Sequence, residues 1–202
     1  RPSSPVAGSV TFDSGTQGVG QVKEYFNDLE AFSWAKESIN ALASLGIVNG
    51  VGEGKFDPSR YVTREEFVKM IVGAFSGTNK NAKVSFKDVD ENDWCYPFVA
   101  TAFEKSYVNG VTDTLFGKGQ NIKRQDAAVI LARILGTKAN VASGFADSAD
   151  ISEYALDAVN LMKQQGIITG NEQNKFLPQN SLTRAECAKM IYALYTKIGE
   201  VK

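Results

Sequence analysis

The chain has 202 residues, of which 43% are hydrophobic and 22% are charged, a composition typical of a globular protein rather than a disordered one. Its 22 basic and 23 acidic residues give a formal net charge of −1, and no stretch gathers the basic residues into the stripe that binds a phosphate backbone. No apolar run approaches the roughly 20 residues of a membrane-spanning helix. We therefore expect neither nucleic acid nor a membrane span.

Histidine is absent, and Cys95 and Cys187 are the only cysteines. The absence of histidine removes the commonest general base and the commonest transition-metal ligand, and we expect no cofactor and no metal. Both cysteines align with alanine or phenylalanine elsewhere in the chain. We expect them to be small buried residues, with a disulfide between them as the alternative.

The sequence repeats with a period of 60 residues. We divide the chain into a linker and lead-in segment at 1–25 and three repeats at 26–85, 86–144 and 145–202. The lead-in is rich in Gly, Ser, Thr and Val, which indicates a linker within a longer protein. The repeat is carried by columns of glycine, phenylalanine, arginine and bulky aromatic residues: Gly50, Gly110 and Gly170; Phe56, Phe116 and Phe176; Arg64, Arg124 and Arg184; Trp34, Trp94 and Tyr154.

The residue pattern of each repeat predicts, in chain order, a first helix, a glycine-rich connection and a second helix. Apolar residues three and four apart define the first helix, and Gly46 and Gly166 should end it, a rule that Ser106 breaks in the second repeat. The second helix begins at Thr63 or Thr183, each followed three residues later by Glu, which is the capping-box pattern. The second repeat loses this cap.

Two helices with one apolar face each cannot bury those faces alone. We therefore predict an all-α fold in which three helix-loop-helix repeats pack as hairpins around a common core. This arrangement is a pseudo-threefold bundle with grooves between neighbouring repeats.

The string Phe-x-Asp, Trp-Ala, Gly-Ile-x-x-Gly, Phe-x-Pro and Thr-Arg-Ala-Glu, spread over residues 26–197, resembles the surface-layer homology (SLH) domain. The resemblance implies non-covalent anchoring of an exported protein to secondary cell wall polysaccharide, often one that carries pyruvate ketals. It also implies an extracellular location, in the cell wall or surface layer of a bacterium with thick peptidoglycan. Neighbouring surface-layer subunits are further partners in the full-length protein.

The arginines Arg64, Arg124 and Arg184 stand at the first turn of a helix, where the macrodipole disfavours a cation. Something anionic should compensate. One interpretation is an Asp or Glu of the same or a neighbouring repeat. The other is a ligand carboxylate held by the guanidinium and by free helix N-terminal amides, and the two are compatible.

The loops between the helices are candidate sugar contacts, because glycine lets a ligand approach the backbone closely. Ordinary turn chemistry is the alternative for them. Trp34 and Trp94 offer flat faces to sugar C–H groups, although an aromatic residue that starts an apolar helical face more often lies in the core. The loop residues concerned are Val48, Asn49, Gly50, Val108, Asn109, Gly110, Thr169 and Gly170.

The repeats are not equivalent. Lys118 stands where the other repeats have proline, which predicts a more basic groove in the second repeat, and Tyr154 in place of tryptophan alters stacking in the third. Asp28, Asp88 and Asp147 are expected to be local caps or turn residues rather than ligands.

Two other functions compete with the binding module. An enzyme acting on the wall needs a pair of carboxylates, and Glu66 and Glu186 are the candidates, but the capping box explains both. Catalysis also needs one asymmetric constellation, whereas this chain repeats its polar residues. A helical-repeat scaffold for a protein partner is the second rival, although its helix pairs recur at shorter periods. We expect a binding module rather than an enzyme.

Overall fold

The computed structural model describes residues 23–200, so most of the predicted lead-in at 1–25 lies outside the described residues. The described part is helical, with isolated backbone bridges in place of strands, and the predicted all-α class is confirmed. Its elements are η1 (Glu30–Phe32), α1 (Ser33–Ser44), α2 (Arg64–Phe75), α3 (Tyr96–Glu104), α4 (Arg124–Leu135), η2 (Ser148–Asp150), α5 (Glu153–Gln164) and α6 (Arg184–Glu200).

The second helix of two repeats begins at the predicted capping box. The Thr63 hydroxyl accepts a hydrogen bond from the Glu66 amide at 3.4 Å, and the Glu66 carboxylate accepts one from the Thr63 amide at 3.0 Å. Thr183 and Glu186 repeat the exchange at 3.3 and 2.8 Å. Lys123, at the same place in the second repeat, makes no side-chain cap, as the sequence predicts.

The first helix of every repeat ends at a left-handed residue. Gly46 and Gly166 have φ angles of 70° and 71°, and Ser106 adopts φ 59° at the equivalent position. The second repeat therefore keeps the conformation of the helix end without the glycine that favours it.

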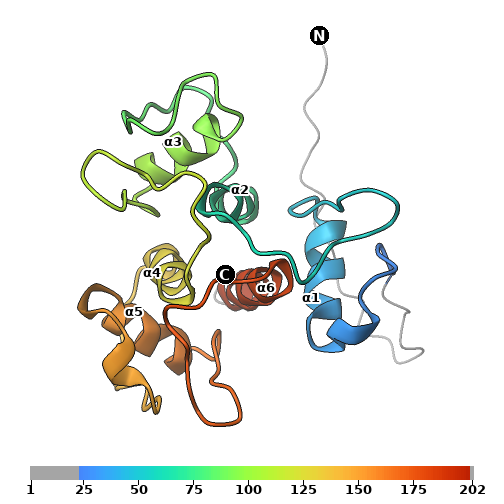
Figure 1. The fold of residues 1–202 in the computed structure, drawn as a ribbon, viewed down its shortest axis with the longest axis vertical. Coiled ribbons are helices and arrows are strands. Elements are labelled where there is room, and N and C mark those ends of the chain that lie inside the picture. Colours follow the sequence, from blue (N-terminus) through green and yellow to red (C-terminus); the bar gives the residue numbers. More distant parts are fainter. Residues whose placement is uncertain (1–22, 201–202) are drawn as a thin grey trace.

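The helices pair differently from the predicted hairpins. Each first helix packs on the second helix of the preceding repeat: α3 lies against α2, and α5 lies against α4 (Figure 1). The first helix α1 packs against the last helix α6, so the ring closes between the first and third repeats. The three repeats do pack together as predicted, but they are not closed hairpins, because each helix pairs mainly with a helix of a neighbouring repeat.

The second helices α2, α4 and α6 lie at the centre, and α1, α3 and α5 surround them (Figure 1). The residues before the central helices form a closed ring of backbone hydrogen bonds. Val62 donates to the Leu182 carbonyl, Ile122 to that of Val62, and Leu182 to that of Ile122, at 3.1, 2.9 and 3.0 Å. All three side chains are buried, so this ring ties the three repeats together inside the core.

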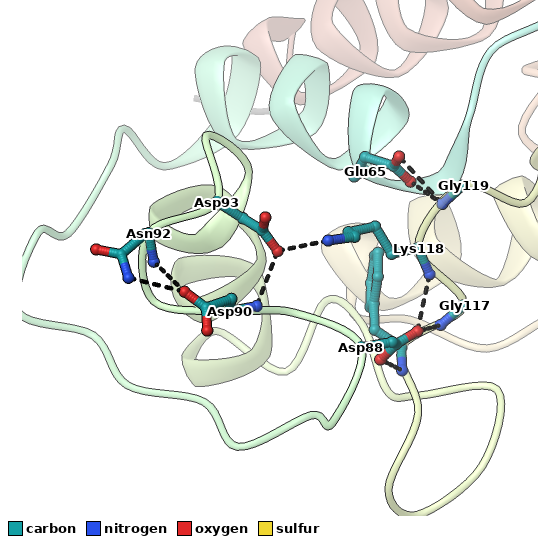
Figure 2. Close-up of polar contacts among 9 residues, drawn as sticks. Glu65, Asp88, Asp90, Asn92, Asp93, Gly117, Lys118 and Gly119 are labelled. Atoms are coloured by element: carbon teal, nitrogen blue, oxygen red, sulfur yellow. Dashed lines mark hydrogen bonds and ion pairs between the residues drawn. The ribbon is translucent and has the colours of Figure 1, made fainter.

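An aspartate of each repeat holds the far end of the glycine-rich loop. Asp88 accepts hydrogen bonds from the Phe116 and Gly117 amides at 2.8 Å each and from Lys118 at 3.0 Å (Figure 2). Asp28 and Asp147 bind the amides of Phe56 and Phe176 in the same way. These aspartates are structural, but the prediction that they act locally is wrong, because each contacts residues 28 to 30 positions further on.

The two cysteines are buried and free, as the sequence predicts. Burial raises the pKa of both thiols, which keeps them protonated and unreactive at neutral pH. They act as small hydrophobic residues of the core.

Candidate ligand-binding grooves

Three grooves of matching composition lie on the described part of the chain, and each is numbered by the repeat whose glycine-rich loop forms one wall. Their volumes are about 310 Å³ for groove 1, 490 Å³ for groove 2 and 260 Å³ for groove 3. Groove 1 is lined by residues 47–51, Arg60, Glu66, Lys69, Met70, Trp94 and Arg184. Groove 2 is lined by Arg64, residues 108–111, Gln120, Lys123, Asp126, Val129, Arg133 and Tyr154. Groove 3 is lined by Trp34, Arg124, residues 167–171, residues 175–177, Glu186, Lys189 and Met190.

Every groove is built from all three repeats. In groove 1 the loop around Gly50 comes from the first repeat, Trp94 from the second and Arg184 from the third. In the other two grooves, too, the loop comes from one repeat, the aromatic residue from the following repeat and the arginine from the preceding one, with the third repeat followed by the first. The partner exchange of the helices explains this arrangement, because it carries the aromatic residue of one repeat onto its neighbour. The predicted site residues are thus brought together in three matching sets.

The arginines reach across to the loop of the next repeat. The Nε atoms of Arg64, Arg124 and Arg184 donate to the carbonyl oxygens of the buried phenylalanines at 3.0, 2.7 and 2.8 Å. The phenylalanine partners are Phe116, Phe176 and Phe56, and each guanidinium lies over its partner's ring, 5.1, 5.1 and 4.3 Å from the centroid. Each arginine therefore fastens one repeat to the next.

Burial lowers the pKa of all three arginines from its ordinary value, because a buried cation loses hydration. The predicted free helix amides do not accompany them. The Arg64 and Arg124 amides donate to the Gln120 and Asn180 carbonyls at 2.9 Å each, and the Arg184 amide donates to that of Arg60 at 2.9 Å. The first amide of each of these helices is therefore not free to bind an anion, because it donates to neighbouring backbone, and a carboxylate site at the arginines stays a prediction.

Two of the arginines also pair with a carboxylate of the next repeat. Arg64 lies 3.7 Å from Asp126, and Arg124 lies 3.3 Å from Glu186. For Arg184, no described carboxylate oxygen lies within 4.0 Å of the guanidinium. The interpretation that the arginines are held by acidic residues is confirmed for the first two.

The aromatic column lies on the surface and not in the core. Trp34, Trp94 and Tyr154 are 45%, 55% and 64% exposed, and each forms part of a groove wall. The prediction that such residues more often lie in the core is wrong for this chain. Trp34 and Tyr154 lie in the first turn of their helices and Trp94 lies two residues before α3, and each of these rings borders a groove with the neighbouring repeat.

Lysines accompany the tryptophans, a feature not predicted from the sequence. Lys69 Nζ lies 5.8 Å from the Trp94 ring centroid, and Lys189 Nζ lies 5.4 Å from that of Trp34. These lysines lie 120 residues apart, at equivalent positions of the first and third repeats, and Val129 occupies that position in the second repeat. This match between two of the three repeats is the signal in the sequence that points to them. They add a cation beside each exposed tryptophan.

Groove 2 departs from the other two in its internal contacts. The Tyr154 hydroxyl donates to Asp126 at 2.6 Å, and burial together with that carboxylate raises the pKa of Tyr154 to about 12. Val129 replaces the lysine, while Arg133 brings a cation one helical turn further along α4. The aromatic ring of groove 2 is thus fixed by its own acidic residue.

The predicted excess of basic charge in groove 2 is wrong. Each groove is lined by three basic residues and one acidic residue. Lys118 does not line groove 2, and its Nζ instead bonds Asp93 at 2.6 Å (Figure 2). The net positive balance is therefore common to all three grooves.

Packing explains why glycine is needed in the loops. A Cβ added at Gly50 would lie 2.6 Å from the Lys55 carbonyl oxygen and 2.8 Å from the Phe26 ring. A Cβ at Gly110 would lie 2.2 Å from the Thr112 carbonyl oxygen, whereas one at Gly170 would have its nearest neighbours at 3.1 Å, a tight contact rather than a collision. The interpretation of these glycines as turn residues is thus supported, and the adjoining Asn49 carbonyl is bound to Arg184 at 2.8 Å.

The groove carboxylates are already engaged. Glu66 and Glu186 complete their capping boxes, and Asp126 binds Tyr154. Among residues 23–200, no group of three or more metal-ligating side chains is arranged to hold an ion. Over the same residues, no helix is long and apolar enough to cross a membrane.

The chain belongs to the S-layer homology domain family, which matches residues 25–68, 85–128 and 144–188. It is 32% identical over 96% of its length to an amylopullulanase of Thermoanaerobacterium thermosulfurigenes, of which it covers 11%. It is 33% identical over 82% of its length to an S-layer protein of Bacillus thuringiensis subsp. finitimus and 32% identical over 82% to the S-layer protein sap of Bacillus anthracis. It covers 21% and 20% of these two proteins.

The chain therefore spans only about a tenth to a fifth of the length of these relatives. Membership of the family supports an anchoring module associated with the cell surface. The resemblance identified from the sequence is confirmed.

Proposed function

We propose that the chain anchors a larger protein to the bacterial cell wall by binding secondary cell wall polysaccharide in its three grooves, without catalysis. The observation that carries this proposal is the convergence, in each groove, of a desolvated arginine, a glycine-rich loop and an exposed aromatic ring from three different repeats. The wall of a bacterium with thick peptidoglycan is the proposed location, and neighbouring surface-layer subunits are proposed partners of the full-length protein.

The charges of the grooves support a ligand with a carboxylate. Three basic residues face one acidic residue in every groove, and the arginines have lost part of their hydration. A carboxylate can accept two hydrogen bonds from one guanidinium, which makes it a matching partner. The pyruvate ketal of a wall sugar offers such a group.

The exposed aromatic rings support a sugar rather than a simple anion. Trp34 and Trp94 are 45% and 55% exposed in the groove walls, and the adjoining loops offer backbone groups for hydroxyls. Because a polysaccharide repeats its ligand unit, three grooves on one chain raise the overall affinity by linking weak contacts.

Sedimentation with purified cell walls, before and after acid extraction of their secondary polysaccharide, tests the proposal. Binding should disappear with the polymer and should fall in the double variant Trp34→Ala/Trp94→Ala. Tyr61→Ala is the matched control, because Tyr61 is as exposed as Trp94, at 55%, and lies outside the three grooves. Undiminished binding to extracted walls would overturn the proposal and would favour a protein partner.

A further inference from the structure

Arg184 differs from the other two groove arginines in having a free edge. Its Nε and one terminal nitrogen donate to the Phe56 and Asn49 carbonyls at 2.8 Å each. No described carboxylate lies within 4.0 Å of it, whereas Arg64 and Arg124 each face one. Groove 1 therefore holds a partly buried guanidinium that still has N–H groups to donate.

A second arginine, Arg60, binds the acidic residue of groove 1. Glu66 is the groove 1 counterpart of the carboxylates that pair with Arg64 and Arg124, but its Oε1 lies 3.0 Å from Arg60. The other Glu66 oxygen accepts from the Thr63 amide. The remaining repeats have Gln120 and Asn180 at the position of Arg60, so only groove 1 has this competing cation.

We propose that Arg60 is a positioning residue that holds Glu66 away from Arg184 and so makes groove 1 bind a carboxylate more tightly than groove 3; the inference rests on the proposed function. In groove 3, a ligand carboxylate has to compete with Glu186 for Arg124. In groove 1 it meets an arginine without that competitor. Arg60 also neutralises the acidic residue that would otherwise repel the ligand.

The two tryptophans allow each groove to be observed separately. Trp94 lies in groove 1 and Trp34 in groove 3, and the chain has no other tryptophan. The indole N–H signals in NMR spectra of the folded chain therefore report the two grooves independently. The probe is a methyl hexoside that carries a pyruvate ketal, and the same hexoside without the ketal is the control. The Trp94 signal should saturate at a probe concentration about tenfold lower than the Trp34 signal.

The substitutions Glu66→Gln and Glu186→Gln form a matched pair. They occupy the same capping position and change the charge equally, but Glu66 is bound by Arg60 and Glu186 by Arg124. E186Q should tighten binding in groove 3 by about tenfold, while E66Q should change groove 1 by less than about threefold. Equal effects of the two substitutions would overturn the proposal.

The substitution Arg60→Gln tests whether Arg60 acts through Glu66. In R60Q, Glu66 can turn to Arg184, and groove 1 should bind about tenfold more weakly. The double variant R60Q/E66Q should recover binding, because it removes the competing carboxylate. If the double variant stays as weak as R60Q, then Arg60 contacts the ligand itself and the positioning role is refuted. If the ketal probe shifts neither indole signal of the wild-type chain, the proposed function fails as well, which distinguishes the two results.

Discussion

Removal of the Asp147 carboxylate should strongly destabilise the fold. Asp147 accepts hydrogen bonds from the Phe176 and Leu177 amides at 2.8 Å each, and its side chain is buried. In Asp147→Ala both donors lose a charged acceptor in a region where water has poor access. An unsatisfied buried donor costs about 1–3 kcal/mol, so the pair should cost about 2–6 kcal/mol. That is a large part of the stability of a typical domain, about 5–15 kcal/mol.

Urea unfolding followed by far-ultraviolet circular dichroism measures this loss as a change in the free energy of unfolding. Asp150→Ala is the control, because Asp150 is an exposed neighbour whose side chain makes no hydrogen bond to the described residues. It should change the free energy of unfolding by less than about 0.5 kcal/mol. A loss below about 1 kcal/mol in D147A would refute the structural role assigned to the three aspartates.

Three further predictions concern stability. Ser106→Gly should raise the free energy of unfolding by about 1 kcal/mol in thermal or urea unfolding, because Ser106 holds the left-handed conformation that Gly46 provides in the first repeat. Gly110→Ala should lower the urea midpoint, with a loss of about 1–3 kcal/mol, because the new Cβ would collide with the carbonyl oxygens of Thr112 and Leu115. The urea midpoint should also fall as the pH drops from about 5 to 2, because a neutral carboxyl group accepts hydrogen bonds from the loop amides more weakly than a carboxylate does.

The sign of the acid effect follows from the aspartates. Burial raises the pKa of Asp88 and Asp147, but the backbone hydrogen bonds lower it by more, so the folded pKa lies below its ordinary value. Their contribution to stability is therefore complete above the unfolded pKa of about 3.9 and is lost as the pH falls through the folded value. D147A should show a shallower pH dependence than the wild type, and an unchanged slope would contradict this origin.

Two controls accompany the glycine predictions. Ser106→Ala should not stabilise the chain, because alanine shares the penalty at positive φ. Gly73→Ala lies inside α2, where an added Cβ meets nothing within 4 Å, and it should stabilise by about 1 kcal/mol. If Gly73→Ala and Gly110→Ala had the same effect, the steric explanation for Gly110 would be wrong.

The sequence predicts the repeats and helix starts because these depend on local chemistry and period. Thr63 and Glu66 lie within one helical turn, so their capping box can be recognised from four consecutive residues. The sequence does not predict which helices pair. The connections before and after α2 are nearly equal in length, and the apolar faces are the same whether α1 packs on α2 or on α6. Neither feature distinguishes a hairpin from an exchanged pair.

The arginine contacts could not be predicted for a related reason. Arg184 binds the Phe56 carbonyl, 128 positions away, across the closure between the last and first repeats. The macrodipole argument correctly calls for a negative partner, and the partner is in part the negative end of a carbonyl dipole and a phenylalanine ring. The exposure of Trp34 and Trp94 could not be predicted either, because it depends on how neighbouring repeats pack against each other.

The most direct test of the carboxylate clamp compares polysaccharide with and without its pyruvate ketals. Isothermal titration calorimetry of the wild-type chain against both polymers keeps the sugar backbone constant and changes only the carboxylate. Arginine clamps in the grooves predict binding at least about tenfold weaker, or about 1.4 kcal/mol, for the polymer without ketals. Equal affinity for the two polymers would contradict the clamp and would leave the aromatic rings and loops as the basis of recognition.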